Sequence, residues 1–161
     1  MSEIMGTLFK YLMGLLGLAV VVGILYATLH KNKASSEVAN LTQMSTNIST
    51  TYTGQATFTG LTTAIAANLA PASMVSGATL VNAWGGAVTV SVDASNASEY
   101  DVIENTVPSD GCVDLVNKAS NYVSLTLGGT TYSSTNPLNP GTATTACNAN
   151  ATANITIIYG H

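Results

Sequence analysis

The sequence has few charged residues and no arginine. Charged residues make up 7% of the 161 positions, against roughly 25% in an ordinary soluble domain. The cations are four lysines, and the formal net charge is -4. Because binding a run of nucleic-acid phosphates takes clustered lysine and arginine, the composition excludes a nucleic-acid partner.

Histidine is also scarce, which argues against an enzyme or a metal centre. The two histidines are His30 and His161. A serine or cysteine nucleophile needs a histidine near it, and zinc ligands typically come in closely spaced pairs. We therefore expect no catalytic residue, no cofactor and no metal site.

Acidic residues are the remaining candidates for chemistry. A carboxylate pair could serve glycoside hydrolysis, and the acids of the C-terminal part are Asp93, Glu99, Asp101, Glu104, Asp110 and Asp114. Charged side chains along a strand also keep the edge of a sheet soluble. We interpret Glu99, Asp101 and the solvent face of the strand around Glu104 in this second way.

A long apolar run occupies the N-terminal part of the chain. No charged residue occurs from Tyr11 to Leu29, and Lys10 and His30 flank the run. As a helix it would be about 28 Å long, close to the roughly 30 Å hydrocarbon core of a bilayer. A secretory signal peptide is the alternative, but no small-residue cleavage site follows. We predict a membrane-anchoring helix.

The helical pattern continues beyond this run. Apolar residues recur at spacings of three and four, at Val38, Leu41, Met44, Ile48 and Tyr52, which is typical of one face of an amphipathic helix. No proline occurs before Pro71, so we predict one continuous helix from about residue 4 to about residue 52. Its amphipathic half should pack on a folded domain.

The composition changes after Tyr52 to threonine, serine, alanine, asparagine and glycine. We therefore divide the chain into residues 1–33, the hydrophobic N-terminal helix, and residues 34–161, a globular head that includes the amphipathic half of the helix. Glycines Gly14 and Gly17 lie inside the first part. They either let neighbouring helices approach closely or permit local unwinding when the helix leaves lipid for a protein assembly.

Alternating apolar residues predict strands in the head. The expected strands are 88–93, 100–107, 123–127 and 155–159, with a short helix at 61–69 and a loop at 136–141. A further helix should begin at an N-cap Ser109 and end near Ala119. The fold class is α+β, with the long helix covering one face of a mainly antiparallel sheet.

The two cysteines, Cys112 and Cys147, enclose the third strand and a proline-rich loop. Two cysteines in an exported, membrane-anchored chain are more often paired than free. A bridge would stabilise the fold by about 3–4 kcal/mol and would place the head outside the cytosol. Two unrelated buried thiols are the alternative.

Several segments resemble those of type IV pilins. They are the apolar helix that runs into Ala34–Tyr52, then Tyr52-Thr53-Gly54, and the stretches Asn68–Val90, VPSDGCVDLV (Val107–Val116) and ACNANATANITI (Ala146–Ile157). Together they cover most of the chain. More narrowly, the chain is similar to type IVb pilins, of the kind that form thin pili of conjugative plasmids and enteric bacteria.

The resemblance implies a subunit that forms filaments. Such a subunit is inserted in the inner membrane with a periplasmic head, is cleaved and N-methylated by a prepilin peptidase, and is assembled by the pilus machinery into a homopolymer. Bundled N-terminal helices form the core of the pilus, and Gly54–Gly86 and Cys112–Cys147 would supply exposed surface and subunit contacts. No basic leader precedes Met1, so we expect the mature form.

The sequence departs from the family pattern near its start. Type IV pilins usually have a glutamate at the fifth mature position, thought to pair with a neighbour's terminal amine, whereas Met5 stands here. Glu3 and Lys10 lie two helical turns apart on one face, so Glu3 can meet the Met1 amine or Lys10 of an adjacent subunit. Alternatively, both charges reach solvent or headgroups at the end of the anchor.

The predicted function is that of a major pilin, a structural subunit for surface attachment, cell-cell contact or conjugation. Within the family, the alternative is a minor pilin or a pseudopilin of a secretion system. Outside it, the alternative is a single-pass membrane-anchored periplasmic binding domain.

Overall fold

The computed structural model describes the backbone of residues 2–160 and the side chains of residues 11–22, 24–25 and 32–160. The chain forms two compact units, Met1–Asn32 and Lys33–His161. Each unit is described separately below.

A single helix, α1 (Ser2–Thr51), occupies the N-terminal third of the chain. This confirms the predicted continuous helix. It ends where Gly54 adopts a left-handed backbone conformation with φ 90°, which glycine adopts at low cost. The amide of Gln55 then donates to the carbonyl of Tyr52, and the chain turns away from the helix axis.

Seven strands form one antiparallel sheet in the order β1-β2-β3-β4-β7-β5-β6. The strands are β1 (Val75–Ser76), β2 (Thr79–Val81), β3 (Ala87–Val92), β4 (Glu99–Pro108), β5 (Ser124–Leu127), β6 (Thr130–Ser133) and β7 (Thr152–Gly160). The C-terminal strand β7 lies between β4 and β5. The expected α+β class with an antiparallel sheet is confirmed, although the sequence analysis missed β1, β2 and β6.

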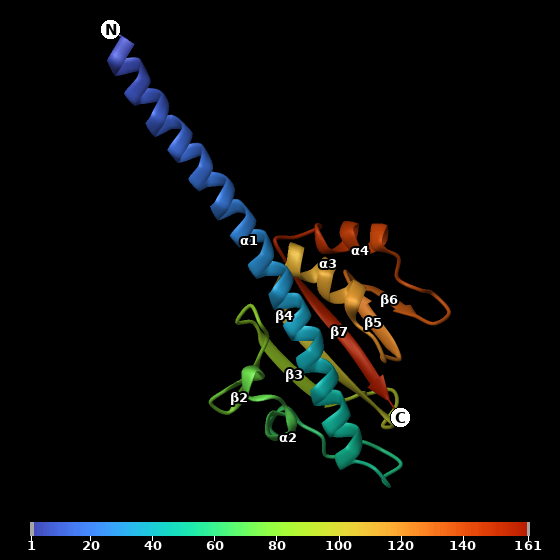
Figure 1. Cartoon of the computed structure of the whole chain (residues 1–161). Coiled ribbons are helices and arrows are strands. Elements are labelled where there is room, and N and C mark those ends of the chain that lie inside the picture. The colour runs from blue at the N-terminus through green and yellow to red at the C-terminus, as the bar shows by residue number, and fades with distance from the viewer. Residues whose placement is uncertain (1, 161) are drawn as a thin grey trace. The chain divides into compact units, whose positions relative to one another are not determined.

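One face of the sheet is buried beneath helices. Burial alternates along β4 and β7, as the period of two in a strand requires. In the β4–β7 register, Tyr100 faces Tyr159 and Val102 faces Ile157. Figure 1 shows the second half of α1 crossing this sheet, with α3 (Ser109–Lys118) beside it.

Three further short helices complete the second unit. They are α2 (Thr63–Leu69), the 3-10 turn η1 (Ala72–Met74) and α4 (Pro140–Cys147). The first confirms the predicted short helix. The stretch predicted as a loop contains the start of α4, because the Asn139 side chain caps the helix by accepting from the Thr142 amide at 2.9 Å and Pro140 suits a first helical position.

The start of α3 also differs from the prediction. Its N-cap residue is Pro108 rather than Ser109, and no side chain caps the helix there. The reason is that β4 continues to Pro108 and leads straight into the helix. Asp110 still lies in the first turn, where its charge complements the helix dipole.

Truncating a core residue of α1 should destabilise the second unit. Met44 is fully buried, so Met44→Ala should lower the free energy of unfolding by about 2–5 kcal/mol. Gln43 is the neighbouring residue and is exposed, so Gln43→Ala is the control. It should change the free energy of unfolding by no more than about 0.5 kcal/mol. Urea unfolding of the full chain in neutral detergent measures both. Equal effects would contradict the packing of α1 on the sheet.

Candidate functional site

The apolar side chains in the first half of α1 are exposed. Tyr11 is 72% exposed, Leu15 70% and Leu18 66%. At Gly14 and Gly17 an added Cβ atom would meet nothing within 4 Å. The other residues predicted to act in assembly, Met1 and the side chains of Glu3 and Lys10, lie outside the described residues. This part of the helix therefore carries an apolar surface that the chain itself leaves exposed.

Within the residues that the structure describes, no helix combines the length and the apolar character needed to cross a membrane.

The predicted packing residues of α1 lie at the centre of the second unit. Leu41, Met44, Ile48 and Tyr52 are at most 6% exposed and belong to the hydrophobic core, and Val38 is partly buried against it. Tyr52 contacts Phe58, whose ring in turn meets Tyr100 edge to face at 4.7 Å. The helix is thus an integral layer of this unit.

A disulfide joins Cys112 of α3 to Cys147 of α4. Both cysteines are fully buried, and their Cα atoms are 5.7 Å apart. The adjacent Gly111 is close to the indole ring of Trp84, because a Cβ atom there would lie 2.5 Å from that ring. Glycine at this position therefore allows the β2–β3 turn to pack against α3.

The turn between β2 and β3 is held by two polar side chains. The side-chain oxygen Oδ1 of Asn82 accepts from the backbone amides of Trp84 at 3.1 Å and Gly86 at 2.8 Å. The amide of Ala83 donates to the Glu37 carboxylate of α1 at 2.7 Å. A side chain of the helix thereby satisfies a backbone group of the turn and links the two elements.

The placement of Glu104 overturns the prediction that it belongs to a solvated edge. It is fully buried, whereas Glu99 and Asp101 on the same strand are partly exposed. Tyr100, Val102 and Glu104 share the buried face because they are separated by two residues each. Opposite Glu104 in the register lie Val88 of β3 and Ile155 of β7.

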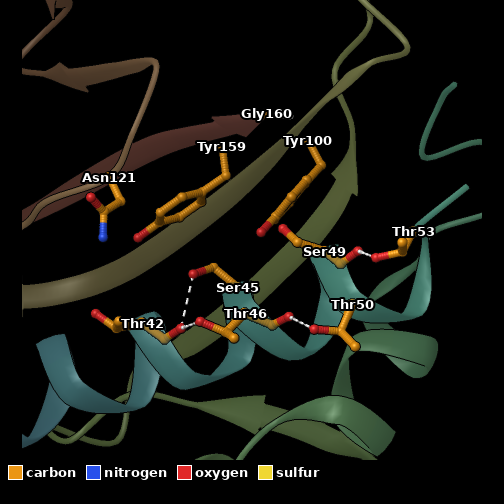
Figure 2. Close-up of a pocket in the computed structure, with 10 residues that line it drawn as sticks. All are labelled: Thr42, Ser45, Thr46, Ser49, Thr50, Thr53, Tyr100, Asn121, Tyr159 and Gly160. Atoms are coloured by element: carbon orange, nitrogen blue, oxygen red, sulfur yellow. Dashed lines mark hydrogen bonds between the residues drawn. The ribbon is translucent and has the colours of Figure 1, made fainter. Parts of the chain in front are cut away.

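A groove of about 410 Å³ lies between the second half of α1 and the ends of β4 and β7. Figure 2 shows the residues that line it. Its lining residues are Thr42, Ser45, Thr46, Ser49, Thr50, Thr53, Tyr100, Asn121, Tyr159 and Gly160. None of these side chains is charged at neutral pH. The groove is therefore lined by neutral hydroxyl, amide and aromatic groups.

Hydroxyl groups on this side of α1 bond back to the helix itself. Thr42, Thr46 and Thr50 each donate to the carbonyl four residues earlier, at 2.7–2.8 Å. Burial raises the pKa of the Tyr100 phenol, and Tyr159 raises it further, while Ser45 and Ser49 oppose the shift. Both tyrosines stay neutral, so the groove offers only uncharged hydrogen-bonding groups.

Comparison with known proteins gives a matching sequence family and a solved structure with a similar fold. Residues 31–160 match the sequence model of a family described as PilS N terminal. Among solved structures, the chain is similar to TcpA, a type IV pilin from Vibrio cholerae El Tor biotype, with a TM-score of 0.59 and 14% sequence identity. The superposition covers 80% of this chain and 99% of TcpA. At this identity the likeness shows the fold. No curated protein sequence matches significantly.

Removing the disulfide should destabilise the second unit. The double variant Cys112→Ala with Cys147→Ala should lose about 3–4 kcal/mol of unfolding free energy, because the reduced chain is less restricted when unfolded. Urea unfolding with and without reductant measures this. Reductant should lower the midpoint of the wild type and leave that of the double variant unchanged. A wild-type midpoint that is insensitive to complete reduction would contradict the expectation.

Proposed function

The chain belongs to the PilS N-terminal family and has the type IV pilin fold, and we propose that it is a major pilin that polymerises through its N-terminal helix into a pilus. In this proposal the unit Lys33–His161 forms the outer part of the filament. The first half of α1 supplies the cohesion of its core.

The exposed apolar part of α1 is the observation that carries the proposal. Burying apolar surface contributes roughly 25 cal/mol per Å² removed from water, and large exposed apolar surfaces mark sites of association. Leu15, Leu16 and Leu18 are each at least 60% exposed. Packing of this segment against the same segment in other copies would remove all of these side chains from water at once.

The stages before assembly form a further part of the proposal. The run Tyr11–Leu29 would hold the chain in the inner membrane, with the head in the periplasm, and a prepilin peptidase and the assembly machinery would then act on it. A methylated Met1 would be the product of that processing. Support for these stages comes from the sequence pattern and from the family.

Charged residues near the start need partners inside a helical core. An unpaired charge buried among apolar side chains is costly. We therefore propose that Glu3 pairs with the Met1 amine or with Lys10 of an adjacent subunit and takes the part of the usual fifth-position glutamate. Gly14 and Gly17 would let neighbouring helices approach closely.

The composition of the head suits an outer surface and subunit contacts. Many hydroxyl and amide groups with few charges avoid both long-range repulsion between copies and the cost of burying ions at contacts. We assign the exposed surface and contacts to Gly54–Gly86 and Cys112–Cys147. From the sequence resemblance to type IVb pilins, we further propose that the pilus is of the type IVb class and serves attachment, cell-cell contact or conjugation.

A charge placed in the exposed apolar segment should abolish assembly. Leu16→Glu would bring a carboxylate into the core, so the chain should disappear from sheared surface fibres by at least tenfold in an immunoblot. Leu16→Met, which preserves volume and apolar character, should leave fibre yield within twofold. Equal yields from the two variants would contradict the proposal. Wild-type chain present only in traces would favour a minor pilin or pseudopilin.

Neutralising Glu3 should also prevent assembly, because its partner would be left without a counter-charge in the core. Glu3→Gln should give no fibres by negative-stain microscopy. Its head should unfold at the wild-type urea concentration, since the second unit does not include residue 3. Normal piliation of this variant would discard the pairing. Wild-type chain that stays monomeric in detergent and never forms fibres would favour an anchored binding domain.

A further inference from the structure

Two glutamates lie buried together between α1 and β4. Glu37 of α1 and Glu104 of β4 are both 0% exposed, and each affects the ionisation of the other. One oxygen of Glu37 accepts from the Ala83 amide. The other oxygen of Glu37 and both oxygens of Glu104 have no hydrogen-bond donor among the described residues. Three buried acceptor atoms are therefore unsatisfied when both side chains are ionised.

The surroundings offer little to compensate two negative charges. Glu104 is flanked in the sheet by Val88 and Ile155. The side-chain amide of Asn82 favours the ionised form of Glu104, and one of its two N–H groups donates to the Asn105 carbonyl at 2.9 Å. Its oxygen is occupied by the β2–β3 turn.

Charged and titratable groups on the neighbouring elements also leave the pair uncompensated. On β7, burial raises the pKa of the Tyr159 phenol, and the charge of Glu104 raises it further. On α3, Lys118 is exposed and donates to the Ser35 hydroxyl at 3.0 Å. The remaining charged groups of α3 and of the described second half of α1 are Asp110, Asp114 and Lys33, none of them buried.

A bound cation does not suit this site. Calcium takes six to eight oxygen ligands, and magnesium retains several waters in an octahedral shell. The cluster supplies the free oxygens of two carboxylates and has no exposed surface. A proton shared between the two carboxyl groups turns one of the three free oxygens into a donor and gives a second one a partner, because a protonated carboxyl group donates a hydrogen bond that a carboxylate cannot.

We propose that Glu37 and Glu104 share one proton, and that this protonated pair fastens α1 to the β2–β3 turn and to the sheet. Glu37 is the ionised member, since its oxygen receives the Ala83 amide. Glu104 holds the proton and donates it toward Glu37. When hydroxide removes this proton, two carboxylates face each other in a buried site, and the attachment of α1 weakens.

Both pKa directions agree with this assignment. Burial raises the pKa of Glu104 well above 4.5, the neighbouring Glu37 charge raises it further, and Asn82 opposes the shift. Burial also raises the pKa of Glu37, but the Ala83 amide opposes that shift. The two protons belong to the pair as a unit and are lost in two macroscopic steps.

The sign of the pH dependence follows from these directions. The folded protein holds the pair's protons more tightly than the unfolded chain does. The stabilising contribution is therefore complete below the unfolded value of 4.5 and is lost as pH rises through the higher folded values. For each proton that only the folded state retains, the ratio of folded to unfolded chain falls about tenfold per pH unit.

The test compares unfolding of the full chain in neutral detergent across pH 4–9 for the wild type and Glu104→Gln. The variant keeps the shape of the side chain and a permanent hydrogen-bond donor. The ratio of folded to unfolded chain should therefore fall, in the wild type relative to the variant, by up to about tenfold per pH unit. Asp101, whose pKa is also raised, contributes equally to both and cancels. Asp114→Asn, on α3 and not buried, is the control and should keep the wild-type slope.

Infrared spectroscopy tests the proton itself and does not need the variant to be stable at every pH. As pH rises above 4.5, the folded wild type should keep a carboxylic-acid carbonyl band that Glu104→Gln lacks and Glu37→Gln retains. Identical pH slopes for the wild type and Glu104→Gln would overturn the proposal. Absence of the band from the folded wild type would overturn it as well. Neither outcome bears on whether the chain forms filaments, so this inference fails independently of the proposed function.

Discussion

The packing of the second half of α1 on the sheet is the contact on which the rest of the second unit depends. Leu41, Met44 and Ile48 belong to the same hydrophobic core as the buried residues of the central strands β4 and β7. Without this layer, apolar residues of the central strands would meet water, and a sheet must bury its apolar face against another element to be stable. The helix therefore packs into the core of the second unit along its second half.

Polar side chains beside this contact satisfy backbone amides of the β2–β3 turn. The side chain of Asn82 closes the β2–β3 turn, and Glu37 reaches from the helix to the amide of Ala83. The disulfide between α3 and α4 restrains the other side of the unit. The buried acid pair is an exception, and a shared proton converts it from an electrostatic cost into a hydrogen bond.

Much of this fold could be predicted from the sequence, because the strongest patterns are periodic. The apolar residues that recur from Val38 to Tyr52, and those that alternate in β3 and β7, are the ones that pack in the core. Strands β1 and β2 have two and three residues, too few for a period to emerge. Strand β6 (TTYS) and helix α4 (PGTATTAC) carry too few large apolar residues to show one. The prediction for Glu104 was wrong because it followed from the charge of the side chain. The position of Glu104, two residues from Val102 on the same face of β4, indicates burial. Glu37 was missed because no local pattern shows which strand a helix will meet.

In the proposed filament one helix serves two cores, with its second half in the head and its first half in the filament. Cryo-electron microscopy of fibres sheared from cells that produce this chain can test this. We expect fibres built from this chain, with a central bundle of helices formed by the segment that includes residues 11–22 and with the Lys33–His161 units outside it. Fibres whose core is built from the heads, or surface fibres that do not contain the chain, would contradict it.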